Sequence, residues 1–118
     1  IQMIESYFAQ NEVSEIWITF PDPQLKKPNK RLTCERFLKL YKNILKQDGI
    51  VHLKTDSQEL YEYTKDEVLI PSKREILYNT NDLYNSDFKE DVIEIQTFYE
   101  AMYLKIGKPI TYLKFKLT

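Results

Sequence analysis

The chain has 118 residues, of which 42% are apolar and 30% are charged, and its formal net charge at pH 7 is −1. This composition is typical of one folded domain and excludes disorder over most of the length. The near-neutral charge gives no overall attraction to nucleic acid, so a nucleic-acid surface would have to be local.

Cysteine and glycine usage narrow the class further. Cys34 is the only cysteine, which excludes an internal disulfide and a CxxC metal site and favours a reducing, cytoplasmic setting. Glycine occurs only as Gly49 and Gly107, so no glycine-rich phosphate or cofactor loop is present. No apolar run reaches the roughly 18 residues of a membrane span, and we expect neither a membrane nor a metal partner.

The predicted elements alternate between helices and strands along the chain. Apolar spacing predicts helices over 1–11, 33–48, 56–71 and 89–106, and β-branched and aromatic runs predict strands over 14–20, 50–55, 74–80 and 110–117. Thr33 is the expected N-cap of the second helix, and Asp48-Gly49 its expected end. This order predicts an α/β fold with a mixed, mostly parallel sheet of about four strands and flanking helices.

Two aspartates follow predicted strands. Asp22 comes after the first strand, between two prolines, and Asp56 comes directly after the second. Ligands of such sheets bind beyond the carboxyl ends of the strands, so adjacent parallel strands would place both carboxylates on one rim. The alternative for Asp22 is an aspartate that hydrogen-bonds its own turn, and the local pattern favours it as much as a ligand contact. The alternative for Asp56 is the N-cap of the next helix, which the local pattern favours over a ligand contact.

A cationic cluster of Lys26, Lys27, Lys30 and Arg31 follows Asp22 and gives a local positive field suited to phosphates. A solvated surface loop is the alternative. Further along, the segment 97–100 places a threonine and a glutamate on one helical face, with an exposed polar stripe as the alternative.

Four segments carry a family resemblance: "IWITFPDPQLKKPNKRLT", "GIVHLKTD", "DLYNSD" and "IQTFYEAMYLKIGKPI", in this order. Together they resemble the bacterial tRNA (guanine-N7-)-methyltransferase family, and most of all its Bacteroidetes-type members, over nearly the whole chain. The resemblance implies a Rossmann-like class I methyltransferase fold, S-adenosylmethionine as cofactor, tRNA as partner and a cytoplasmic enzyme that methylates N7 of a guanine.

The resemblance also implies residue roles. Asp22 corresponds to the proposed catalytic residue and touches the cofactor pocket. The positions that correspond to substrate-binding residues are Lys26, Asp56, Thr97, Phe98, Tyr99 and Glu100. The positions that fall where the family contacts RNA are Lys27, Pro28, Asn29, Lys30 and Arg31.

The chain departs from the family pattern in three respects. Gln24 stands where an aromatic residue is usual, the basic loop is about two residues shorter, and the half that carries the glycine-rich loop is missing. We therefore expect residues 1–118 to form a single partial domain, the C-terminal substrate-side half, which is inactive alone and binds the cofactor weakly or not at all.

An apolar first strand would be exposed at the sheet edge, where a second copy could pair with it. The rival hypothesis is a non-catalytic α/β module that binds RNA or a protein through residues 26–31.

Overall fold

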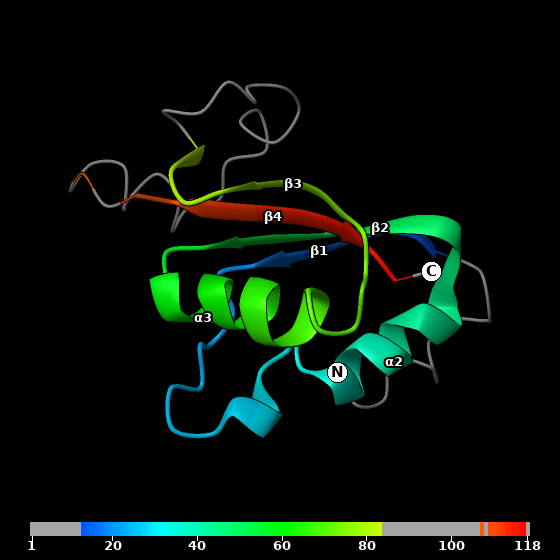
Figure 1. Cartoon of the computed structure of the whole chain (residues 1–118), viewed down its shortest axis with the longest axis horizontal. Coiled ribbons are helices and arrows are strands. Elements are labelled where there is room, and N and C mark those ends of the chain that lie inside the picture. Colours follow the sequence, from blue (N-terminus) through cyan, green and yellow to red (C-terminus); the bar gives the residue numbers. More distant parts are fainter. Residues whose placement is uncertain (1–12, 84–106, 108, 118) are drawn as a thin grey trace.

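A computed structural model describes residues 13–83, 107 and 109–117. The elements, in chain order, are β1 (Val13–Thr19), η1 (Pro28–Lys30), α2 (Glu35–Ile44), β2 (Leu45–Thr55), α3 (Gln58–Glu62), η2 (Tyr63–Leu69), β3 (Ile76–Thr80) and β4 (Thr111–Lys116) (Figure 1). Of these, η1 is a short 3-10 turn, and η2 continues α3 as a π-helix. The helices predicted over 1–11 and 89–106 lie outside the described residues.

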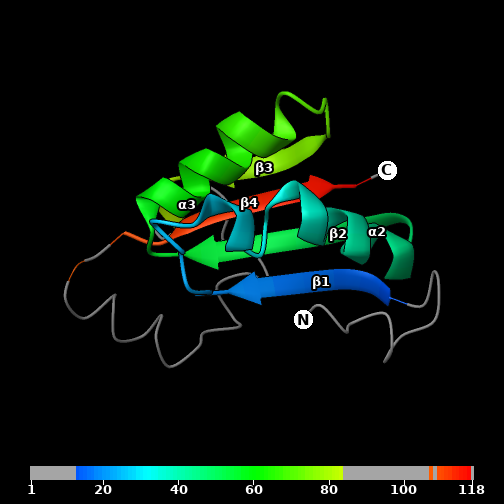
Figure 2. The ribbon, with the colours of Figure 1, turned by 90° about the horizontal axis from the view of Figure 1, so that it is seen from below.

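The four described strands form one sheet in the order β1-β2-β4-β3 (Figure 2). β1 pairs with β2 in parallel, whereas β4 is antiparallel to both β2 and β3. β1, β2 and β3 therefore point the same way, and β4 is inserted between two of them in reverse. Because Tyr112 at the start of β4 pairs with Thr80 at the end of β3, the chain re-enters the sheet from the rim where β3 ends. The mixed sheet is confirmed, but only one neighbouring pair is parallel.

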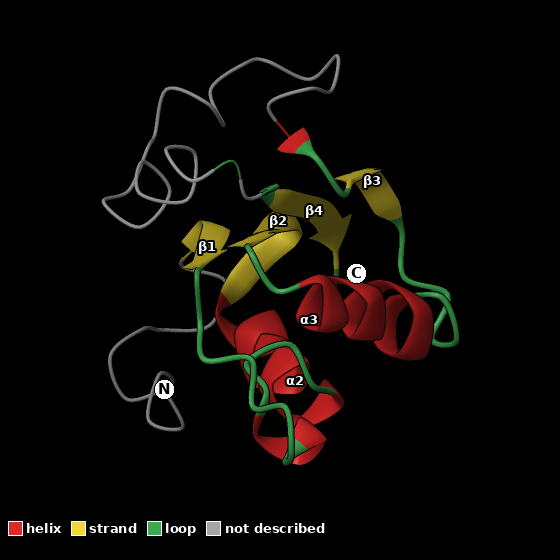
Figure 3. Ribbon diagram, turned by 90° about the vertical axis from the view of Figure 1, so that its left-hand side faces the viewer, coloured by secondary structure: helices red, strands yellow, loops and turns green. Residues whose placement is uncertain are grey.

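Both described α-helices cover the same face of the sheet (Figure 3). Alternate residues of the strands point toward this face, as the two-residue period of a strand requires. The main core lies between the two layers and is built by buried side chains from the strands and helices, among them Ile18, Val51, Leu53, Leu113 and Phe115 from the sheet and Phe37, Leu38, Tyr41, Leu60 and Leu69 from the helices. Burial of these apolar side chains is the main contribution to the stability of such a domain.

The second helix begins and ends at other residues than predicted. Its N-cap is Cys34, which makes no capping hydrogen bond with its side chain. Thr33 cannot cap the helix because its hydroxyl lies 2.6 Å from that of Thr64, in the buried layer between loop and helix. The helix ends at Ile44, and the strand β2 begins at the next residue.

The Asp48-Gly49 pair forms an irregularity inside β2 and does not end a helix. Asp48 has a φ of 64°, and a Cβ on Gly49 would lie 2.8 Å from the carbonyl oxygen of Lys46. The register with β1 shifts here, because Val13 pairs with Leu45 but Glu15 pairs with Ile50. The prediction that Asp48-Gly49 ends the helix is therefore wrong, because the pair forms a bulge inside the strand.

On the other face of the sheet, His52 is buried among side chains of neighbouring strands. Its ring stacks on Trp17 with centroids 3.7 Å apart and an angle of 4° between the planes. Nδ1 lies 2.8 Å from the hydroxyl of Tyr112, and Nε2 lies 3.2 Å from a carboxylate oxygen of Glu15. Burial lowers the pKa of His52, and the hydrogen bond and charge of Glu15 only partly oppose this.

Candidate functional site

The first two strands end side by side at one rim of the sheet. Thr19 pairs with Lys54, and the N–H of Phe20 donates to the carbonyl oxygen of Lys54 at 2.8 Å. Asp22 and Asp56 follow these two strand ends. The expectation that adjacent parallel strands bring both loops to one rim is confirmed.

The backbone around Asp22 is held in a tight turn. Phe20 and Gln24, on either side of the Pro-Asp-Pro sequence, have φ values of 48° and 47°, in the left-handed region that non-glycine residues rarely adopt. Oδ1 of Asp22 accepts a hydrogen bond from the N–H of Gln24 at 3.0 Å, so the turn interpretation holds for this oxygen. Asp22 is exposed, and its Oδ2 accepts no hydrogen bond from any residue in the described part of the chain.

Asp56 does not cap the following helix. The N-cap of α3 is Ser57, whose Oγ accepts a hydrogen bond from the N–H of Leu60 at 3.1 Å. The N–H of Ser57 in turn donates to Oγ1 of Thr55 at 3.0 Å. The alternative of an N-cap role for Asp56 is therefore wrong, and Asp56 is a half-buried residue directly before the cap.

Three lysines project from the ordered loop that follows Asp22. Backbone hydrogen bonds from the N–H of Lys27 to Gln24 (3.0 Å) and from the N–H of Lys30 to Lys27 (2.9 Å) give the loop successive turns. The side chains of Lys26, Lys27 and Lys30 are exposed, and none forms an ion pair with a residue that the structure describes. Pro28 and Asn29, the other predicted RNA contacts, are exposed as well. Among the residues that the structure describes, the loop therefore presents three lysines without an ion-pair partner.

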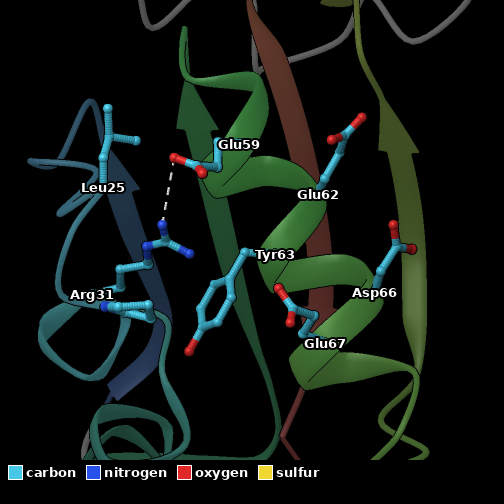
Figure 4. A pocket seen from close by; sticks show the side chains of 8 residues that line it. Leu25, Arg31, Glu59, Glu62, Tyr63, Asp66 and Glu67 are labelled. Carbon is cyan, nitrogen blue, oxygen red and sulfur yellow. Dashed lines mark ion pairs between the residues drawn. The ribbon is translucent and has the colours of Figure 1, made fainter.

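Arg31, also predicted to contact RNA, is buried where the three lysines are exposed. Its side chain is only 4% exposed, and its Nε–H donates to the carbonyl oxygen of Pro23 at 2.8 Å. The guanidinium carbon lies 4.4 Å from the centroid of the Tyr63 ring, and Nη2 lies 3.6 Å from a carboxylate oxygen of Glu59 (Figure 4). These contacts hold the guanidinium against the helix, so it is not presented at the surface with the lysines.

A pocket of about 430 Å³ opens between this loop and the helix of α3 and η2. In Figure 4 the carboxylate of Glu59 lies above Arg31, whereas Glu62, Asp66 and Glu67 lie to the right of the Tyr63 ring. The lining combines loop residues with carboxylates of the helix: Leu25, Pro28, Arg31, Glu59, Glu62, Tyr63, Asp66 and Glu67. The carboxylates of this pocket would repel a phosphate group.

The described ranges contain no group of three or more His, Cys, Asp or Glu side chains placed to hold a metal ion. In the same ranges no helix is long and apolar enough to cross a membrane. The predicted substrate segment Thr97, Phe98, Tyr99 and Glu100 lies outside the described residues.

Sequence reasoning missed Glu59 and Tyr63 as partners of the loop. Both lie in the helix after the next strand, and only the folded topology brings them to Arg31. The sequence shows only a cluster of basic residues. Nothing in that cluster distinguishes the arginine, which precedes an apolar residue, from its lysine neighbours.

The mixed sheet with one reversed strand, helices on one face and an acid-bearing loop at the carboxyl rim define part of a Rossmann-like α/β fold of the class I methyltransferase type. Residues 1–113 match the family model described as "Putative methyltransferase". The chain belongs to this family, as the four sequence segments predicted.

Curated relatives point the same way. The chain is 55% identical over 120 residues to the tRNA (guanine-N(7)-)-methyltransferase of Christiangramia forsetii, covering 99% of this chain and 53% of that protein. It is 48% identical over 117 residues to the tRNA (guanine-N(7)-)-methyltransferase of Bacteroides thetaiotaomicron, covering 99% of this chain and 46% of that protein. A bifunctional glycosyltransferase/methyltransferase of Fusobacterium nucleatum is 36% identical over 114 residues, covering 96% of this chain and 18% of that protein. The chain spans about half the length of the tRNA methyltransferases it matches.

Proposed function

We propose that this chain is the substrate-side half of an enzyme that transfers a methyl group from S-adenosylmethionine to N7 of a guanine in tRNA. One observation carries the proposal: a fixed turn at the end of β1 leaves Asp22 exposed, in the same loop as three exposed lysines that form no ion pair within the described residues. The names of the curated relatives supply the reaction class. In this proposal residues 1–118 form one partial domain of a cytoplasmic protein, and the buried thiol of Cys34 fits a reducing setting.

The chemistry asks little of the protein beyond placement and charge. Guanine N7 carries a lone pair, so no proton would have to leave before methylation. The methyl–sulfur bond of S-adenosylmethionine would break as the new bond forms, so that a neutral thioether leaves and the positive charge passes to the ring. A fixed carboxylate stabilises that charge and accepts hydrogen bonds from the N–H groups of the base. The free oxygen of Asp22 would perform this task, while its other oxygen keeps the turn in place.

The remaining residues of the rim would hold the RNA. Lys26, Lys27 and Lys30 would bind backbone phosphates, and Pro28 and Asn29 would lie against the same strand. Asp56 would bind the substrate from the neighbouring strand end. The family resemblance assigns the segment Thr97–Glu100 to the same substrate.

The described residues do not by themselves fit the cofactor. The two glycines lie at the β2 bulge and just before β4, so neither forms a glycine-rich turn after a strand at the rim, and the pocket beside the loop is lined by carboxylates. S-adenosylmethionine would therefore be held mainly by the part of the relatives' length that this chain does not span, with Asp22 at the edge of the cofactor pocket.

The test is product formation by the complete protein encoded by the gene. Purified protein is incubated with unmodified tRNA and S-adenosylmethionine, and nucleosides are analysed by mass spectrometry for N7-methylguanosine. The proposal predicts this product with the complete protein and none with the 118-residue chain alone. A complete protein that binds tRNA but never forms the product would contradict it, as would micromolar binding of S-adenosylmethionine to the chain alone by calorimetry.

The three exposed loop lysines also favour the second candidate, a non-catalytic module that binds RNA through the loop. Both functions predict that replacing Lys26, Lys27 and Lys30 with alanine weakens tRNA binding and lowers the slope of log affinity against log salt by about 2 to 3. An unchanged slope would remove the loop from the interface. The sequence that precedes Ile1 in the gene separates the two: a strand with a glycine-rich turn favours the enzyme.

A further inference from the structure

We propose that Arg31 is a positioning residue, which fixes the carboxylate of Asp22 through a shared peptide group and does not bind RNA itself. Its consequence for catalysis rests on the proposed function, whereas its consequence for the loop does not. The proposal separates Arg31 from the three lysines with which it shares the basic segment 26–31.

The first step is a chain of two hydrogen bonds through one peptide group. Nε–H of Arg31 donates to the carbonyl oxygen of Pro23 at 2.8 Å. The N–H at the other end of that same peptide group belongs to Gln24, and it donates to Oδ1 of Asp22 at 3.0 Å. A cation on the carbonyl polarises the peptide and strengthens its N–H as a donor, and it also fixes the orientation of the peptide plane. Arg31 thereby orients the Asp22 carboxylate.

The second step is the anchor at the other end of the side chain. The guanidinium lies over the ring of Tyr63 and beside the carboxylate of Glu59, both on the helix that follows β2 (Figure 4). That helix is capped by Ser57, the residue directly after Asp56. Arg31 therefore ties the loop that carries Asp22 to the helix that begins beside Asp56, and sets the two rim carboxylates relative to each other.

The third step is burial. A side chain that is 4% exposed cannot leave these partners for a phosphate without breaking all of them. The buried cation is favoured by the carboxylates that line the same pocket, of which Glu59 is the one in ion-pair range. A lysine at this position would keep the charge but has no planar fork to reach Pro23 and lie flat on Tyr63 at once.

The variants are Arg31→Lys, which keeps the charge, and Glu59→Gln, which removes one anchor at a largely exposed residue and leaves folding intact. The matched control is Arg74→Lys, because Arg74 also forms a paired contact with a carboxylate, to Glu35 at 2.6 and 2.7 Å, away from Asp22. Amide hydrogen exchange is measured on the complete protein. We expect the N–H of Gln24 to exchange about tenfold faster in Arg31→Lys and less so in Glu59→Gln. Amides of β2 and α2 should be unchanged, and Arg74→Lys should leave Gln24 unaffected.

The second readout separates positioning from phosphate binding. The slope of log tRNA affinity against log salt should be the same in wild type and Arg31→Lys, and Arg31→Ala, if folded, should also keep it. Alanine at a single loop lysine should lower the slope by about 0.7 to 0.9. In methyl transfer, Arg31→Lys should lower kcat with little change in the KM for tRNA. The proposal is overturned by unchanged exchange at Gln24 in Arg31→Lys, or by a slope that falls in Arg31→Ala as it does for a lysine. Faster exchange in a protein that forms no N7-methylguanosine would uphold the positioning role and contradict the proposed function alone.

Discussion

The hydrogen bond between two buried threonines, Thr33 and Thr64, predicts that removing one hydroxyl destabilises the chain more than removing the other. Thr33 and Thr64 are fully buried, and their hydroxyl oxygens are 2.6 Å apart. The hydroxyl of Thr64 also lies 2.8 Å from the carbonyl oxygen of Leu60, to which it donates. Each hydroxyl has one proton, so Thr33 must be the donor of the pair and Thr64 its acceptor.

The two valine variants should therefore differ although they remove the same kind of group. Thr33→Val removes a donor and leaves the proton of Thr64 on Leu60, which should cost about 0.5 to 1.5 kcal/mol of unfolding free energy. Thr64→Val leaves the buried Thr33 hydroxyl without an acceptor, and an unsatisfied buried group adds about 1 to 3 kcal/mol. Removing both hydroxyls leaves no orphan, so the double variant should be more stable than Thr64→Val.

Urea unfolding of the 118-residue chain, followed by the fluorescence of Trp17, measures these differences if the slope of the transition is the same in all variants. Circular dichroism on the same samples checks that the unfolding is two-state. The donor assignment is refuted if Thr33→Val is the more costly single change, or if the two costs simply add in the double variant.

Three further predictions concern the sheet, a helix cap and a strained turn. Burial lowers the pKa of His52 in the folded state, so the stability that the neutral ring contributes is present above about pH 6.5 and is lost as pH falls through the lower folded pKa. His52→Gln should therefore lose less unfolding free energy than wild type between pH 7 and 5. An identical pH profile of the two proteins would contradict this. Ser57→Ala should cost about 1 kcal/mol in thermal unfolding because the N–H of Leu60 loses its acceptor, and an unchanged melting temperature would argue against the cap. Lys73 has a φ of 58°, so Lys73→Gly should stabilise the chain by about 0.5 to 1 kcal/mol, and destabilisation in urea would show that the turn is not strained.

The strands were predictable because their signal is local. Each of the four described strands overlaps its predicted range, since alternation and β-branched residues encode the two-residue period directly. The extension of β2 back to Leu45 was missed because Asp-Gly suits both a helix end and a bulge. Only the pairing with β1 decides between them.

The part of the candidate site that lies in one loop could be predicted from the sequence, as the strands could. Asp22 and the lysines are read from a proline-bounded loop after a strand, and the structure places them there. The contacts of Arg31 with Tyr63 and Glu59 join residues that meet only in the folded chain, so no local pattern could predict them. The same argument applies to Thr33, whose hydroxyl is used by Thr64 and not by its own helix. The cap of α3 is local, since Ser57 accepts from Leu60 three residues on, but Asp56 directly before it is an equally suitable capping residue type.

The most direct test of the account is the single-turnover rate of methyl transfer in Asp22 variants of the complete protein, with tRNA and S-adenosylmethionine saturating. Asp22→Asn keeps an oxygen that can accept from Gln24 and removes only the charge, whereas Asp22→Ala removes both. The account predicts that both variants bind tRNA as wild type does and lose a factor of about 100 or more in rate, as expected when a fixed electrostatic group is removed from the transition state. A wild-type rate of N7-methylguanosine formation in Asp22→Ala would contradict it.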